Sequence, residues 1–137
     1  MKNNYLKSLL FIMCIFVISG CVKKTDTKTS DKNEIKYIAY YFHPTARCEA
    51  CLNLENYIKE LIETKFSNKG FVYKSLNIEQ KENEPYRKDF NLLFSSVIIE
   101  NSMNKKWINL DSIWSFTNNK IKFFEYTEKE INQFINN

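Results

Sequence analysis

The chain has 137 residues, with 20 basic and 16 acidic side chains and a formal net charge of +4. This length allows one globular domain but not two. Because lysines alternate with acidic residues and form no basic face, the sequence excludes nucleic acid as an expected partner.

The first 20 residues are typical of a secretory signal. Two lysines and no acidic residue precede an almost unbroken apolar run at 9–18, and small residues follow it. The run is shorter than the roughly 20 residues that a membrane-spanning helix needs. Ile-Ser-Gly-Cys at 18–21 fits the lipobox of bacterial lipoproteins, in which Cys21 becomes the N-terminus and receives lipid. We therefore predict a signal peptide at 1–20, with an ordinary signal peptide or an uncleaved anchor as the alternative.

A polar tether is predicted after the lipidation site. Residues 21–34 contain no core residue beyond Val22, which favours a flexible segment. The acyl chains on Cys21 would hold the domain predicted at 35–137 on a bacterial membrane. We therefore expect a lipid-anchored protein of the cell envelope, exposed outside the cytoplasm, whose mature formal charge is +2 after Lys2 and Lys7 are lost.

The four cysteines divide according to these segments. Cys14 lies in the signal peptide and Cys21 is capped by lipid, so only Cys48 and Cys51 remain as thiols. These two are separated by two residues, in a compartment where disulfides can form. This CxxC pair is the strongest chemical signal in the sequence.

The first half of the domain predicts a strand, a helix and a second strand. Residues 35–42 are rich in β-branched and aromatic side chains, as in a buried strand. After a break at 43–47, apolar residues recur every three or four positions from Glu49 to about Phe66, which indicates an amphipathic helix. Gly70 marks its end. A second strand is predicted at 71–78.

The second half predicts a helix, a hairpin of two strands, a short helical segment and a last helix. The predicted ranges are 85–93 (with Pro85, Tyr86, Phe90 and Leu93), 96–100, 105–108, 111–116 and 121–135. A shorter last helix, capped at Thr127, is the alternative. This order predicts an α/β, thioredoxin-like fold with a central mixed sheet of about four strands flanked by helices. The CxxC pair falls where such folds place their redox motif.

The predicted position of the pair gives the two thiols different roles. Cys48 lies at the start of a helix, where unpaired N–H groups and the helix dipole stabilise a thiolate, and Arg47 adds a positive charge. Cys51 lies one turn further, on the buried face. We expect Cys48 to attack the disulfide of a protein partner and Cys51 to resolve the mixed disulfide. Glu49 opposes the dipole, which favours a moderate reductant or electron carrier over a strong oxidant.

Two alternatives use the same residues. Cys48 and Cys51 could form an inert structural disulfide, although so short a loop gains little stability from it. They could instead bind Cu(I) or arsenite together with His43, the only histidine, because soft thiolates suit thiophilic metals and metalloids.

The stretch 40–51, Tyr-Tyr-Phe-His-Pro-Thr-Ala-Arg-Cys-Glu-Ala-Cys, resembles the small thioredoxin-like proteins catalogued as ArsF-family subunits of a nitrophenyl compound nitroreductase. Segments 107–114 and 123–126 are also similar to that family. The resemblance spans roughly residues 37–135 and implies an exported thiol protein or an accessory subunit of a reductase. With two glycines the chain has no dinucleotide-binding fingerprint, so we expect no cofactor here, and a flavin would belong to a separate subunit.

One feature departs from ordinary thioredoxins. They carry a cis-proline just before the third of these strands, facing the cysteines, whereas this chain has Ser95 and Ser96 there. The groove that presents backbone to a substrate peptide is therefore expected to differ.

Overall fold

The computed structural model describes residues 34–137, so the predicted signal peptide, Cys21 and most of the predicted tether lie outside the described residues. Within residues 34–137 one mixed sheet is formed by β1 (Tyr37–His43), β2 (Phe71–Asn77), β3 (Ser96–Asn101) and β4 (Trp107–Asn109). The strand order is β2-β1-β3-β4. β1 runs parallel to β2 and antiparallel to β3, and β4 runs antiparallel to β3. The predicted thioredoxin-like α/β fold is confirmed.

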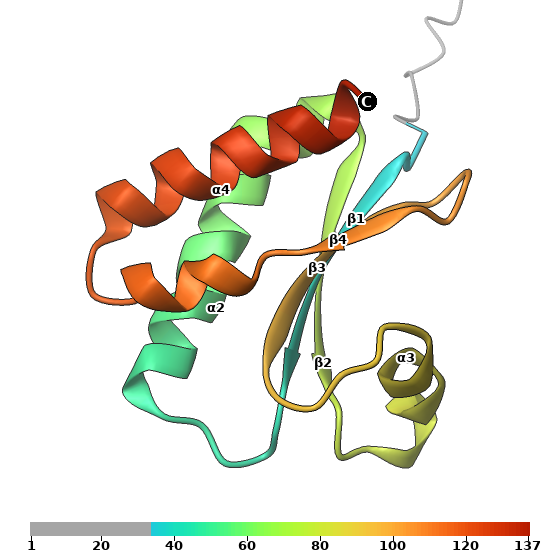
Figure 1. Ribbon diagram of the computed structural model, residues 1–137, viewed down its shortest axis with the longest axis vertical. Helices are drawn as coiled ribbons and strands as arrows, with labels where there is room; N and C mark the ends of the chain where they lie inside the picture. Colours follow the sequence, from blue (N-terminus) through green and yellow to red (C-terminus); the bar gives the residue numbers. More distant parts are fainter. Residues whose placement is uncertain (1–33) are drawn as a thin grey trace, which may run out of the picture. The chain divides into compact units, whose positions relative to one another are not determined.

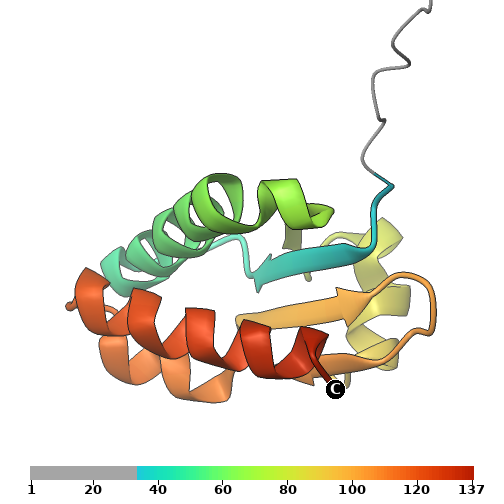
Figure 2. The ribbon, with the colours of Figure 1, turned by 90° about the horizontal axis from the view of Figure 1, so that it is seen from above.

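Helices cover the two faces of the sheet unequally. α2 (Glu49–Leu61) and α4 (Lys120–Ile135) lie on one side of the sheet, and the short α3 (Glu84–Asp89) lies on the other (Figures 1 and 2). No helix within the described part of the chain is both long enough and apolar enough to span a membrane.

Strand β1 contributes to both hydrophobic clusters because successive side chains of a strand point to opposite faces. Ala39 and Tyr41 pack with α2 and α4, whereas Tyr40 and Phe42 pack with residues of and just after α3. All four side chains are buried. The near-continuous apolar run of this central strand is thereby explained, since neither of its faces meets solvent.

The first helical segment ends differently from the prediction. α2 stops at Leu61, and a π-helical turn (Ile62–Phe66) and a 3₁₀ turn (Ser67–Lys69) follow. The predicted helix to about Phe66 was therefore only partly α-helical, although Phe66 is buried as its spacing indicated. Gly70 ends the segment with φ of 80°, and a Cβ there would lie 2.8 Å from the backbone oxygen of Glu34. Only glycine fits this position without strain.

The predicted helix 85–93 was wrong at its end. α3 stops at Asp89, and Asn91 adopts a left-handed conformation with φ of 50°. This reversal buries Phe90 and Leu92 against the sheet and leaves Leu93 exposed. The spacing of Leu93 therefore predicted a helical face that does not form.

The long last helix is confirmed as α4, and the alternative start at Thr127 was wrong. Thr127 is fully buried in the middle of α4, and Asn119 instead caps the helix by accepting a hydrogen bond from the Lys122 N–H. Ile121, in the first turn, is exposed. The predicted helical segment at 111–116 is a 3₁₀ helix, Asp111–Phe116.

Candidate functional site

Cys48 is the N-cap residue of α2. Its backbone is extended, with φ of −88° and ψ of 166°, and its Sγ accepts a hydrogen bond from the Cys51 N–H at 3.2 Å. The predicted position of Cys48 at a helix start is thereby confirmed. In the reduced protein this N–H group would stabilise a thiolate, because the first N–H groups of a helix have no partner within the helix.

The two cysteines form a disulfide and differ in access to solvent. Their Cα atoms are 5.0 Å apart, Cys48 is exposed, and Cys51 retains 8% of its accessible surface. The Tyr41 hydroxyl donates a hydrogen bond to the Cys51 carbonyl at 2.9 Å, so the second cysteine is held against β1. An incoming disulfide can therefore reach Cys48 before it can reach Cys51.

Arg47 was predicted to add positive charge beside Cys48, but its side chain pairs with Glu55. Its Nη2 lies 2.5 Å from Glu55 Oε2, and its guanidinium carbon lies 5.6 Å from the centre of the Tyr41 ring. Glu55 also accepts a hydrogen bond from the Ser75 hydroxyl at 2.8 Å. Because the Glu55 carboxylate balances its charge, Arg47 supplies less positive potential to Cys48 than its sequence position indicated.

The break between β1 and α2 is tied to the end of β2. The Thr45 N–H donates to Glu79 Oε2 at 3.0 Å, and the Asn77 amide donates to the Thr45 hydroxyl at 2.9 Å. The hydrogen bonds from Thr45 hold the pKa of Glu79 below its usual value, so this carboxylate stays ionised and available as an acceptor. These contacts position the segment that presents Cys48.

His43 and Glu49 take different positions around the pair. The His43 Nδ1 lies 2.9 Å from the carbonyl oxygen of Pro44, and its ring stacks on Tyr41 with ring centres 5.7 Å apart. Within residues 34–137, no three His, Cys, Asp or Glu side chains come together as a metal site. The structure thus gives no support to the alternative in which His43 joins the thiols as a ligand. Glu49 is exposed in the first turn of α2.

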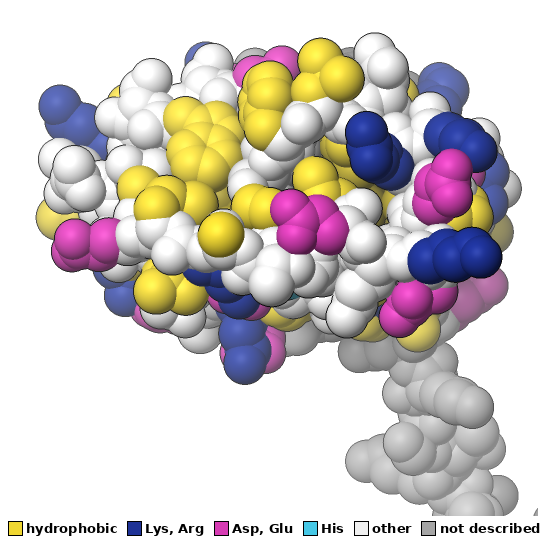
Figure 3. Space-filling view, turned by 90° about the horizontal axis from the view of Figure 1, so that it is seen from below, with side chains coloured by type: hydrophobic (Ala, Val, Ile, Leu, Met, Phe, Trp, Pro, Cys, Tyr) yellow, Lys and Arg dark blue, Asp and Glu magenta, His cyan; other side chains and the backbone are white. Residues whose placement is uncertain are grey.

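An apolar surface lies at the same end of the sheet as the disulfide. Figure 3 shows hydrophobic side chains gathered on this face of the molecule, which is the lower end in Figure 1. Phe94, Ser95 and Trp114 line a depression of about 250 Å³, and the Phe94 side chain is 63% exposed. Ser95 precedes β3, whose first residue, Ser96, pairs with Phe42 near the end of β1. We call Leu93, Phe94 and Trp114 the apolar rim.

Serine occupies the place where ordinary thioredoxins carry the cis-proline. Ser95 is buried, and residues 34–137 contain no cis peptide bond. The expected departure from ordinary thioredoxins is therefore present just before β3.

Comparisons with known proteins found no relative of this chain that could assign a role to the site. No model of a protein family, no curated protein and no solved structure matches this chain. The sequence alone indicated no role for Tyr41, Glu55 or Phe94. A signal for Glu55 was present, because an acidic residue four positions after Cys51 lies on the same side of the helix as that buried cysteine. Nothing in the sequence around Phe94 distinguished it from a core residue.

Proposed function

We propose that this chain exchanges disulfides with protein partners through Cys48 and Cys51. The observation that carries the proposal is the joining of an exposed N-cap cysteine to a buried cysteine one turn along the same helix. This arrangement supplies a nucleophile that is stabilised as a thiolate and a resolving thiol that partners cannot reach first.

The reaction begins with the reduced pair. The Cys48 thiolate attacks one sulfur of a partner disulfide, the partner S–S bond breaks, and the leaving thiolate takes up a proton. Cys51 then loses its proton and attacks Cys48 Sγ, which breaks the mixed disulfide and releases the second partner thiolate. Two electrons have passed to the partner, and the chain is left with the Cys48–Cys51 disulfide. A dithiol donor returns the two electrons in the next cycle.

The apolar rim supports a protein as the partner. Leu93 and Phe94 are exposed just before β3, at the end of the sheet where Ser96 pairs with Phe42, and a partner chain could cover them there. Exposed apolar surface of this kind is characteristic of sites that contact other proteins. A free small thiol would gain little from such a surface.

Trapping of the mixed disulfide tests the proposal. In Cys51→Ser the first step proceeds and the second cannot, so the reduced variant should accumulate a covalent complex with a protein disulfide such as that of insulin. Cys48→Ser is the matched control and should form no complex, because the remaining thiol is buried. Wild-type chain should reduce insulin in the presence of a dithiol donor. Absence of both reduction and trapping would refute disulfide exchange.

We also propose that the chain is lipidated at Cys21 and works outside the cytoplasm on a bacterial membrane. The support is the sequence of the first 21 residues, with its basic start, apolar run and lipobox. In a bacterial host, acyl labelling of the chain should disappear in Cys21→Ser and persist in Cys14→Ser, which alters the discarded segment. Equal labelling of both variants would exclude lipidation at Cys21.

A further inference from the structure

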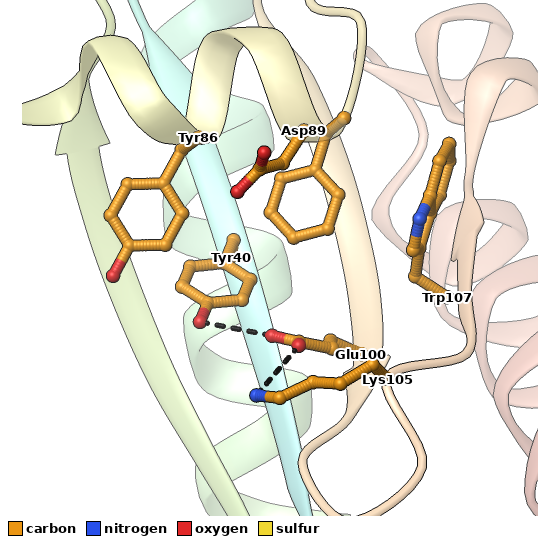
Figure 4. Close-up of a pocket in the computed structure, with 7 residues that line it drawn as sticks. Tyr40, Tyr86, Asp89, Glu100, Lys105 and Trp107 are labelled. Carbon is orange, nitrogen blue, oxygen red and sulfur yellow. Dashed lines mark hydrogen bonds and ion pairs between the residues drawn. The ribbon is translucent and has the colours of Figure 1, made fainter.

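The sheet face beneath α3 contains a recess that the thiol chemistry does not use. α3 has six residues, and beside it a recess lies between the sheet and the β3–β4 hairpin (Figure 4). The recess measures about 350 Å³, and aromatic side chains supply much of its wall: Tyr40, Tyr86, Phe90 and Trp107. Its size lies at the lower end of the range for small-molecule sites, which is roughly 300–1,000 Å³.

Glu100 lies in this recess with only 7% of its surface exposed. It belongs to β3 and pairs across the strands with Trp107 of β4, so the carboxylate and the indole are on the same face. Its Oε2 accepts a hydrogen bond from the Tyr40 hydroxyl at 3.1 Å. Burial, and next the charge of Glu100, raise the pKa of Tyr40, so its phenol remains a donor. A buried carboxylate nevertheless requires a positive partner.

The cation that partners Glu100 is the ammonium group of a solvent-exposed lysine. Lys105 Nζ lies 3.2 Å from Glu100 Oε1, but the lysine side chain is 72% exposed. Lys105 stands in the hairpin turn with φ of 61°, a conformation in which lysine is uncommon. Figure 4 shows the Glu100 carboxylate between the Tyr40 hydroxyl and the Lys105 ammonium, with Tyr86 and Trp107 on either side. An ion pair with so exposed a lysine is weak and can be exchanged for another cation.

The aromatic walls of the recess also favour a cation as the ligand. The ring centres of Tyr40 and Tyr86 are 5.4 Å apart, and those of Phe90 and Trp107 are also 5.4 Å apart with the planes nearly perpendicular. The Tyr40 ring already accepts a cation, since Lys74 Nζ lies 5.8 Å from its centre. Aromatic faces attract organic cations through their quadrupoles, and more strongly where water is excluded. Asp89 adds a second carboxylate to the lining.

We propose that this recess binds a small organic cation of the alkylammonium class, which displaces the Lys105 ammonium from Glu100. The carboxylate provides the charge, and the aromatic walls contact the alkyl groups. The site is separate from Cys48 and Cys51, because α3 and the recess are on the face of the sheet opposite α2. The proposal therefore does not depend on disulfide exchange.

Choline and its neutral isostere 3,3-dimethylbutan-1-ol provide the first test. Both are titrated into the purified full chain at constant ionic strength, with binding followed by calorimetry and by the fluorescence of Trp107 in a Trp114→Phe background. We expect saturable binding of choline and binding of the alcohol that is weaker by about tenfold or more. Equal affinity for the two ligands, or no saturable choline binding, would overturn the proposal.

Variants of the two charged residues provide the second test. Glu100→Gln keeps the size of the side chain and should weaken choline binding by about tenfold or more. Lys105→Asn removes the competing ammonium, tolerates the left-handed backbone, and should strengthen binding several-fold. Lys106→Asn, at the neighbouring lysine, is the matched control and should change nothing. If Lys105→Asn binds choline no more tightly than Lys106→Asn does, the proposal that choline displaces the Lys105 ammonium is wrong. This comparison remains decisive if Glu100→Gln fails to fold.

Discussion

Arg47 and Glu55 form an ion pair, with 2.5 Å between Nη2 and Oε2, that joins the segment before α2 to the second turn of that helix. Their side chains are 24% and 20% exposed, so water screens the two charges only in part. Glu55 has a second partner in Ser75, whereas Arg47 Nε has no hydrogen-bond partner among the described residues. The pair thus fixes the approach to Cys48 and balances the positive charge nearest to it in sequence.

Replacing Glu55 by Gln should lower stability and raise the reactivity of Cys48. Arg47 would lose its counter-charge in a largely buried position, at a cost of about 1–3 kcal/mol in the free energy of unfolding. The unbalanced guanidinium would also favour the Cys48 thiolate at neutral pH. Urea unfolding measures the first effect, and the rate of alkylation of the reduced chain by iodoacetamide measures the second.

The matched control is Glu60→Gln, which removes an ion pair with Lys120 on the surface. Those side chains are 47% and 46% exposed, so the free energy of unfolding should change by no more than about 0.5 kcal/mol. Alkylation of Cys48 should be unaffected. Equal losses of stability in the two variants would show that burial of the Arg47–Glu55 pair has no energetic consequence.

Tyr41 and Tyr73, whose hydroxyl groups are both buried, should respond differently to loss of those hydroxyls. Tyr41→Phe deletes the hydrogen bond to the Cys51 carbonyl and should cost about 1 kcal/mol. Tyr73→Phe removes a buried hydroxyl for which the structure, over residues 34–137, shows no hydrogen-bond partner, so it should be neutral or stabilising. Thermal and urea unfolding of the oxidised chain measure both. A larger loss in Tyr73→Phe than in Tyr41→Phe would contradict the hydrogen bond of the Tyr41 hydroxyl and the lack of one at Tyr73 over residues 34–137.

Stability should fall at alkaline pH. Burial raises the pKa of Tyr40, Tyr41 and Tyr73 above the ordinary value of 10.0. Above that pH the unfolded chain releases protons that the folded chain retains, so unfolding becomes more favourable as pH rises. The protonated phenols contribute fully to the free energy of unfolding below about pH 10. Above that pH, ionisation of each tyrosine in the unfolded chain lowers the free energy of unfolding by up to about 1.4 kcal/mol per pH unit.

Urea unfolding from about pH 8 to about pH 11 measures this decline, and absorbance of ionised tyrosine identifies its source. Tyr73→Phe should make the decline shallower, because one of the three buried phenols is removed. A free energy of unfolding that stays constant to about pH 11 would be incompatible with the buried phenols.

Glu49→Gln tests the charge that the sequence placed beside the nucleophile. Removing this exposed carboxylate from the first turn of α2 should increase the thiolate fraction of Cys48 and stabilise the reduced pair. The reduction potential, measured against glutathione buffers, should therefore become less negative. Glu63→Gln, beyond the end of α2, is the control and should leave the potential unchanged. A more negative potential in Glu49→Gln would reverse the electrostatic argument.

The fold was predictable because its main signals are local. Cys48 follows a buried strand and precedes an amphipathic helix, and both patterns depend on short-range periodicity alone. The end of α3 was not predictable in this way, because Asn91 adopts a left-handed conformation that leaves Leu93 exposed. Periodicity indicates which residues could share a helical face and does not show where the backbone turns.

The contacts around Cys48 and in the recess involve residues far apart in the sequence, so they were harder to predict from the sequence. Arg47 was predicted to stabilise the thiolate of the adjacent Cys48, but its ion-pair partner is Glu55, in the second turn of α2. The hydrogen-bond donor to Glu100 is Tyr40, sixty positions earlier in the chain. Neither contact follows from spacing, since each depends on how strand and helix pack in three dimensions.

The apolar rim should affect reaction with proteins more than reaction with small molecules. Phe94→Ser removes an exposed ring beside the depression at Ser95, so it should slow insulin reduction by about tenfold and leave the folded state intact. Reaction of Cys48 with a small aromatic disulfide should be unchanged, because the variant does not alter the N-cap. Met103→Ser removes a similarly exposed side chain, 69% against 63%, in the β3–β4 turn at the other end of β3. It should affect neither reaction, and equal slowing of insulin reduction by Phe94→Ser and Met103→Ser would remove the apolar rim from partner binding.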